Sequence, residues 1–227
     1  MPRNQSPLVN TPCKLCEKKR ARRYCPGVAG EICPQCCGTE RENTIDCPLD
    51  CEHLQAARQH ERPAPLSEHD FPNHELPNKD IRITEQFLKD QDHLVIWLSH
   101  SLARAMESGK AVDGDAREAL EAMIKTYRTL ESGLIYESKP DNPYAAGIQE
   151  ALKAAIEELR KRIAGEAGLE VSTGLKDKDL LGVLVFLQRL EIQHNNGRRK
   201  GRAFLDFLRS YFPAAPAAPA PGQDLAI

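Results

Sequence analysis

The stretch CKLCEKKRARRYCPGVAGEICPQCCGTERENTIDCPLDC, residues 13–51, contains all eight cysteines of the 227-residue chain. Two Cys-x2-Cys pairs, Cys13 with Cys16 and Cys33 with Cys36, are separated by sixteen residues. This spacing is typical of a four-thiolate zinc site. A segment of this length cannot bury enough apolar surface to fold around a core of its own, so it needs a crosslink. The sequence therefore predicts a small N-terminal module held together by metal.

The other four cysteines are the right number for a second tetrahedral site. Adjacent residues point their side chains in different directions, so Cys37 is expected to turn away from Cys36 and toward a second ion. The two ligand sets would then alternate along the chain, and each ion would close a loop that holds ligands of the other. The predicted ligands of the second site are Cys25, Cys37, Cys47 and Cys51, with His53 as an alternative ligand.

Other states of the thiols stay open at this point. The N-terminal sequence MPRNQSPLVN lacks the apolar run of a secretory signal, so a reducing cytoplasm is expected, and with it zinc rather than disulfides. An iron–sulfur cluster also takes four cysteines, but the dense Cys-x2-Cys-x2-Cys run is missing. A redox dithiol would need a strand followed by a helix around one of the pairs, a setting that the sequence there does not indicate.

Residues 12–53 resemble the two-zinc cross-brace modules of the RING, MYND and HIT-finger classes. The step Tyr24-Cys25-Pro26 is similar to the aromatic-Cys-Pro step of HIT-type fingers. The chain departs from these classes at Cys25, which has no partner two or three residues later, and at the doubled Cys36-Cys37. The resemblance implies a metal-held interaction surface, and it implies no ubiquitin-ligase activity because the partner-binding details of such domains are not matched.

Cationic residues gather in two clusters of the chain. The first lies between Cys16 and Cys25 and the second in a turn between the last two predicted helices. Together they could contact phosphates, and a short turn between helices is similar to a helix-turn-helix arrangement. The alternative is that they offset thiolate charge and a helix dipole. The residues are Lys18, Lys19, Arg20, Arg22 and Arg23 in the first cluster and Arg198, Arg199, Lys200 and Arg202 in the second.

The rest of the chain has helical periodicity. Apolar residues recur at spacings of three and four, with stop signals between the runs, and the stripe of the second run extends to Leu134. Thr84 and Asn142 are expected to be N-caps, the latter followed by a proline at the first helical position. About five helices are expected, over residues 84–109, 113–134, 142–165, 178–194 and 201–212, and the segment 178–194 is apolar on most sides and so central. The fold class is therefore mainly α, with a Cys-rich zinc-stapled module and an all-α bundle.

Composition shifts divide the chain into parts. A Pro-rich stretch separates the module from the helices, and a Pro/Ala stretch ends the chain. No run approaches the roughly 18 apolar residues of a membrane span. The expected parts are a flexible N-terminus 1–11, the module 12–61, a linker 62–80, the helical domain 81–212 and a disordered tail 213–227.

Function is expected to lie in binding rather than in catalysis. The formal net charge of −2 gives no overall attraction to nucleic acid. Glycine-rich phosphate loops, a nucleophile elbow and paired-carboxylate signatures are missing. The primary hypothesis is a non-enzymatic intracellular adaptor that binds a protein partner, with Tyr24, Phe71 and the first basic cluster as contact groups. The alternatives are a nucleic-acid-binding regulator that uses both basic clusters, and a metal-dependent or thiol redox enzyme.

Overall fold

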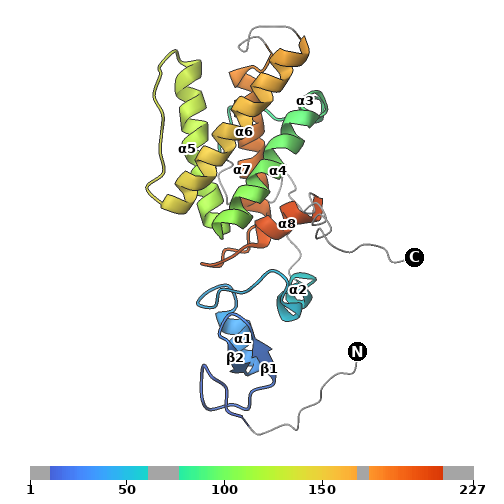
Figure 1. Ribbon diagram of the computed structural model, residues 1–227, viewed down its shortest axis with the longest axis vertical. Coiled ribbons are helices and arrows are strands. Elements are labelled where there is room, and N and C mark those ends of the chain that lie inside the picture. Colours follow the sequence, from blue (N-terminus) through green and yellow to red (C-terminus); the bar gives the residue numbers. More distant parts are fainter. Residues whose placement is uncertain (1–10, 61–76, 168–173, 212–227) are drawn as a thin grey trace, which may run out of the picture.

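The computed structural model describes residues 11–60, 77–167 and 174–211, which form a small Cys-rich head and a helical domain (Figure 1). The predicted N-terminal segment up to residue 10, linker residues 61–76 including Phe71, and the tail from residue 212 lie outside the described residues. The linker was expected to extend to residue 80. Its described end lies against the helical domain, where Asn78 contacts Gln188 and Arg128.

The head is built from two short strands and two short helices. Strands β1 (Arg23–Cys25) and β2 (Gly30–Ile32) pair antiparallel, and helices α1 (Pro34–Glu40) and α2 (Glu52–Arg58) follow. Its buried interior consists largely of cysteines, with Ile32, Ile45 and Leu54 as the larger apolar side chains. So few apolar residues cannot stabilise a fold alone, in agreement with the need for a crosslink.

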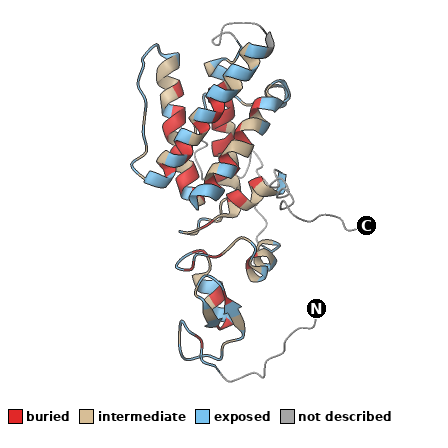
Figure 2. Ribbon diagram, viewed as in Figure 1, coloured by how far each residue is buried: buried red, intermediate tan, exposed pale blue. Residues whose placement is uncertain are grey.

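The helical domain packs around one central helix. It comprises α3 (Glu85–Asp90), α4 (Asp92–Gly109), α5 (Asp113–Glu131), α6 (Pro143–Ala167), α7 (Asp177–His194) and α8 (Ala203–Tyr211). Helix α7 contacts α4, α5 and α8, and Figure 2 shows buried residues concentrated where α4, α5, α6 and α7 face one another. The prediction that segment 178–194 is central is confirmed by its buried residues, Leu180, Leu181, Val183, Leu184, Val185 and Leu187.

The predicted helix count was wrong. The described residues contain eight helices, two in the head and six in the helical domain, where about five were expected. The additional helix arises because the segment predicted as one helix after Thr84 breaks at Gln91, whose φ of −111° and ψ of 20° are not helical. Thr84 caps α3 as predicted, since its Oγ1 accepts from the backbone N–H of Phe87 at 3.1 Å.

Helix α5 ends three residues before its predicted limit. Gly133 adopts a positive φ of 79°, and the N–H of Leu134 donates to the carbonyl of Thr129 at 2.9 Å. This is the Schellman arrangement that ends a helix at a left-handed glycine. Leu134, expected on the buried stripe of the helix, is instead 63% exposed. The predicted helix was too long because the apolar spacing continues beyond Gly133, the residue that ends the helix.

Other helix boundaries agree with the sequence. Asn142 caps α6 as predicted, because its Oδ1 accepts from the N–H of Tyr144 at 2.9 Å and Pro143 is the first helical residue. Among the described helices, none is both long and apolar enough to cross a bilayer.

Candidate metal centre

Four cysteines of the head bring their sulfur atoms together. The Sγ atoms of Cys13, Cys16, Cys33 and Cys36 all lie within 4.8 Å of one another, and those of Cys16 and Cys33 are 4.0 Å apart. Four thiolates placed tetrahedrally at about 2.3 Å from a zinc ion would be about 3.8 Å apart. The group can therefore hold one metal ion, and it consists of the two Cys-x2-Cys pairs that the sequence singled out.

The backbone around this group points N–H donors at the sulfurs. Cys33 is the N-cap of α1, and its Sγ accepts from the N–H of Cys36 at 3.4 Å. The N–H of Cys33 donates in turn to the Sγ of Cys13 at 3.2 Å. Such donors stabilise a thiolate, which is the form that binds metal. Pro34 at the first helical position needs no N–H partner, which suits this tight start of α1.

The electrostatics of Cys13 and Cys16 favour thiolates. Burial raises the pKa of Cys13, but backbone N–H donors from Cys16, Cys33 and Leu15 outweigh it and lower that pKa to about 6. The backbone N–H groups after Cys16 lower the pKa of that thiol as well. Backbone donors therefore favour the thiolate form of both sulfurs.

Cys36 has the opposite tendency. Its hydrogen bond with the side chain of Cys33, followed by burial and by contacts with the sulfurs of Cys16 and Cys13, raises its pKa to about 12. A fourth negative charge is thus unfavourable beside the other three sulfurs unless a cation lies among them. The donor set and its charge balance fit a divalent metal.

One expectation about this group was wrong. The sequence did not indicate a strand followed by a helix, yet strand β2 leads directly into Cys33 and α1 begins immediately after it. Two such short elements have too little periodicity to be seen in the sequence. The setting by itself would suit a redox dithiol. However, Cys33 is only 2% exposed, whereas a redox cysteine that attacks a substrate must be accessible.

The other four cysteines meet at a second place in the head. They line one small pocket of about 10 Å³, roughly the space of a single water-sized sphere, together with His53. The lining cysteines are Cys25, Cys37, Cys47 and Cys51. The sulfur atoms of this second set do not meet the spacing of the first group. Among the described residues, the first group is the one set whose ligand atoms all lie within 4.8 Å of one another. Burial raises the pKa of Cys47.

The adjacent cysteines Cys36 and Cys37 face different groups, as their position on one helix requires. Cys36 belongs to the first group, whereas Cys37 lines the second pocket. The Sγ of Cys37 lies 3.7 Å from Nη1 of Arg23 and 3.8 Å from Nη2 of Arg41. Arg23, predicted as a phosphate contact, therefore faces a thiol inside the head.

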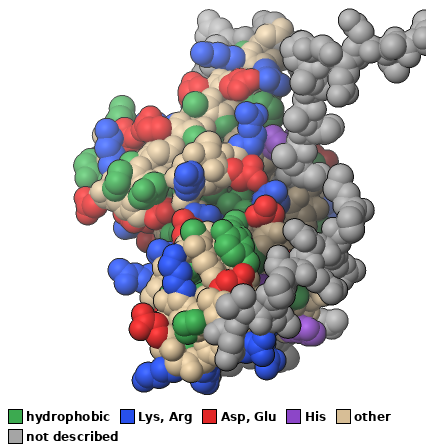
Figure 3. Space-filling model, turned by 60° about the horizontal axis from the view of Figure 1, so that its bottom comes forward, with side chains coloured by type: hydrophobic (Ala, Val, Ile, Leu, Met, Phe, Trp, Pro, Cys, Tyr) green, Lys and Arg blue, Asp and Glu red, His purple; other side chains and the backbone are tan. Residues whose placement is uncertain are grey.

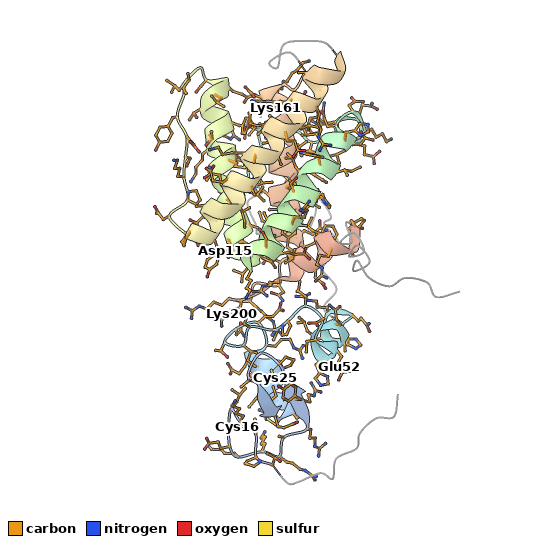
Figure 4. The ribbon with its side chains drawn as sticks, viewed as in Figure 1. Cys16, Cys25, Glu52, Asp115, Lys161 and Lys200 are labelled. Atoms are coloured by element: carbon orange, nitrogen blue, oxygen red, sulfur yellow. The ribbon has the colours of Figure 1, made fainter. Side chains whose placement is uncertain are left out.

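The remaining cations of the first cluster lie on the surface. Lys18, Lys19, Arg20 and Arg22 are exposed, and Lys19 donates to the side-chain carbonyl of Gln35. The loop that carries them lies at the end of the head farthest from the helical domain, around the labelled Cys16 in Figure 4.

Three cations of the second basic cluster contact the head. The turn between α7 and α8 lies against the head, at the junction marked by Lys200 in Figure 4. Three of its four cations contact the loop that follows α1, and only Arg199 is fully exposed. The contacts are Arg198 Nη1 to Arg41 O at 2.7 Å, Lys200 Nζ to Thr44 O at 2.9 Å and Arg202 Nη2 to Asp46 Oδ1 at 3.2 Å.

Glu42 is the centre of this junction and was missed in the sequence. It is 1% exposed and accepts hydrogen bonds from Arg58 at 2.7 Å, from Asn196 at 2.8 Å and from the backbone N–H of Arg202 at 3.0 Å. Its own carbonyl accepts from the N–H of Lys200 at 2.6 Å. No motif marks Glu42, because Asn196 and Arg202 lie more than 150 residues away in the turn before α8, and Arg58 lies 16 residues away in α2.

Comparison with protein-family models, curated proteins and solved structures finds no match for this chain. Its likeness to cross-brace modules stays a prediction from cysteine spacing.

Proposed function

We propose that this chain is a non-enzymatic cytoplasmic adaptor, in which two structural zinc ions hold the head that a partner recognises. The observation that carries the proposal is the first sulfur group, with its four Sγ atoms within 4.8 Å of one another and backbone N–H groups directed at two of them. Four thiolates fill every position of a tetrahedral zinc ion, so no position is left for a substrate.

The first ion would be held by the two Cys-x2-Cys pairs. The second would be held in the pocket lined by the other four cysteines, with His53 as the alternative ligand. Bound zinc would supply the folding free energy that the small apolar interior of the head cannot. The two ligand sets alternate along the chain, as in the cross-brace modules that the head resembles, so each ion would stabilise the loops of the other.

An adaptor role is supported by the way the head is attached to the helical domain. The buried Glu42 and the turn before α8 fix it to the helical domain. Tyr24 and Leu15 stay 60% and 40% exposed on its surface. A small rigid head with exposed apolar groups, fixed to a larger domain, suits recognition of a partner.

The test is the metal content of the full chain purified without chelator, with the variants Cys36→Ser and Cys37→Ser as a matched pair. We expect two zinc ions in the natural chain, one in each variant and none in the double variant. A double variant that retains one ion would place both cysteines in one site. Iron, or a metal-free protein with a reversible Cys33–Cys36 disulfide, would instead support redox chemistry.

A further inference from the structure

We propose that the outer face of the segment from Arg20 to Tyr24 binds single-stranded nucleic acid. This inference names the partner of the head and rests on the proposed function, because zinc would hold the segment in shape. The face is made by Arg20, Arg22 and Tyr24, which we call the Arg-Tyr face.

The segment is extended and paired on both sides. The N–H of Ala21 donates to the carbonyl of Thr11 at 2.9 Å, and the N–H of Arg22 donates to the carbonyl of Ile32 at 3.0 Å. Side chains of an extended segment alternate between two faces. The exposed residues are Arg20, Arg22 and Tyr24, and the intervening Ala21, Arg23 and Cys25 are partly or fully buried. Successive groups of the Arg-Tyr face are therefore about 7 Å apart along a rigid line.

The charge of the head is divided between its two halves. Residues 11–30 contain six cationic residues and one acid, whereas residues 31–60 contain two cationic residues and six acids. Figure 3 turns this end of the molecule forward and shows Lys and Arg side chains around its lower rim. Arg20 and Arg22, about 7 Å apart along the segment, thus lie within the roughly 10 Å over which charges act at ordinary salt, even though the chain as a whole is slightly acidic.

Tyr24 favours a nucleic acid over an acidic protein. Tyr24 is 60% exposed and lies two residues from Arg22 on the same face. Cations that follow the backbone, combined with an exposed aromatic ring on which a base stacks, are the features of sequence-tolerant single-strand binding. An acidic peptide would use the cations alone. Glu31, the cross-strand partner of Tyr24, is the one acid on this part of the sheet.

The footprint is confined to the head. The sequence predicted a second set of phosphate contacts in the turn before α8. Three of these residues instead contact the loop after α1, namely Arg198, Lys200 and Arg202. The affinity for a nucleic-acid strand bound along the Arg-Tyr face is therefore expected to be unchanged by substitutions in the turn before α8.

The test is fluorescence anisotropy of the zinc-loaded full chain with labelled oligo(dT) and oligo(U) of about a dozen nucleotides, a length within the range that one small domain covers. Poly-glutamate serves as the competitor that carries charge without bases. The variants are Arg20→Gln/Arg22→Gln, Tyr24→Ala and, as the matched control, Arg199→Gln. Zinc content and far-UV circular dichroism of each variant are measured first.

We expect the double arginine variant to bind at least tenfold more weakly, and its salt slope to fall by about 1.4, because each phosphate contact on a single strand contributes about 0.7. Tyr24→Ala is expected to bind about tenfold more weakly with an unchanged salt slope. Arg199→Gln should bind as the natural chain does. Stronger binding of oligo(U) than of oligo(dT) would identify RNA as the preferred nucleic acid, and the reverse would identify DNA.

Three results would overturn the inference: zinc-loaded protein that does not bind either oligonucleotide, equal loss of binding in Arg199→Gln, or complete competition by poly-glutamate at equal charge. The last would indicate an acidic protein partner. None of these results would argue against the proposed zinc sites. If the zinc sites themselves were wrong, the natural chain would lack the metal.

Discussion

At the scale of single residues, the charged groups at the junction explain how the head is joined to the helical domain. Glu42 has a positive φ of 53°, which is unfavourable for a residue with a side chain, and its carboxylate is almost fully enclosed. Such a position is tolerated only where several donors compensate the buried charge. Arg58 supplies one of them and also pairs with Asp206 of α8 at 2.7 Å, so one guanidinium joins the head to the helical domain.

Glu42→Gln is predicted to destabilise the protein by about 3 kcal/mol, because it leaves the buried guanidinium of Arg58 without its full counter-charge. Chemical denaturation followed by circular dichroism measures the free energy of unfolding. Glu52→Gln, at an exposed position of the same head, is the matched control and should change it by less than about 0.5 kcal/mol. Equal effects of the two changes would contradict the central role of Glu42.

Asp113 predicts a pH dependence. Its carboxylate is buried and accepts from the backbone N–H groups of Phe204 and Leu205 at 3.0 and 3.3 Å, so it caps α8. Burial raises its pKa from 3.8 to about 7, the two N–H donors oppose this, and the charges of Glu191 and Glu42 add to the rise. A raised pKa means that the folded state binds the proton more tightly than the unfolded state.

The contribution of Asp113 to stability is therefore full below about pH 4 and is lost as the pH rises to about 7. Asp113→Asn cannot titrate. Thermal melting of both proteins across this range should show the variant gaining stability relative to the natural chain as the pH rises. A difference in Tm that stays constant with pH would show that Asp113 does not titrate there.

At the scale of elements, one glycine explains how α3 and α7 approach. Gly182 interrupts an apolar run in the sequence, and in the structure it faces the ring of Phe87 so closely that a Cβ there would lie 2.5 Å from the ring. Its absent side chain is what lets Phe87 pack against α7. The break that separates α3 from α4 at Gln91 permits α3 to be directed onto α7.

Gly182→Ala is predicted to destabilise the protein by about 1–3 kcal/mol through overpacking against Phe87. Gly147→Ala is the control, because Gly147 lies in the exposed interior of α6 with no atom within 4 Å of an added Cβ. That change should stabilise by up to about 1 kcal/mol through helix propensity. Phe87→Leu combined with Gly182→Ala should recover part of the loss, and unfolding by denaturant measures all three. Equal signs for the two glycine changes would contradict the close approach.

At the scale of the whole molecule, the contacts around Glu42 and Arg58 join the head to the helical domain, so we expect their stabilities to be coupled. The helices have their own apolar core, so they should remain folded when metal is removed from the head. The junction at Glu42 depends on the loop after α1, which the metal sites would hold in place. Loss of metal is therefore expected to weaken the helical domain without unfolding it.

Chelation is predicted to leave the far-UV helical signal almost unchanged at room temperature and to lower the Tm of the helices by several degrees, since about 1 kcal/mol corresponds to 2–4 °C in a protein of this size. In Glu42→Gln the chelator should lower the Tm by less, because the junction is already weakened. An unchanged Tm in the natural chain, or an identical drop in the variant, would show that the two parts are independent.

The sequence by itself determined the chemistry that depends on local spacing. The Cys-x2-Cys pairs indicated the first sulfur group, and capping residues such as Thr84 and Asn142 marked where helices begin. These signals act over a few residues, so they are readable without a fold. The break at Gln91 and the early end of α5 were missed because apolar spacing records which face is buried and not where the backbone changes direction.

Only the tertiary structure decided how the charges are used. Two similar basic clusters occur in the sequence. The first remains largely on the surface, whereas three of the four cations of the second contact the head at the junction with Glu42, where Asn196 and Arg202, both distant along the chain, bind its carboxylate. The small pocket lined by Cys25, Cys37, Cys47 and Cys51 also depends on how α1, α2 and the β1–β2 hairpin pack together. Burial and pairing of charge are properties of chain segments brought together in space, and for that reason no local pattern could have revealed them.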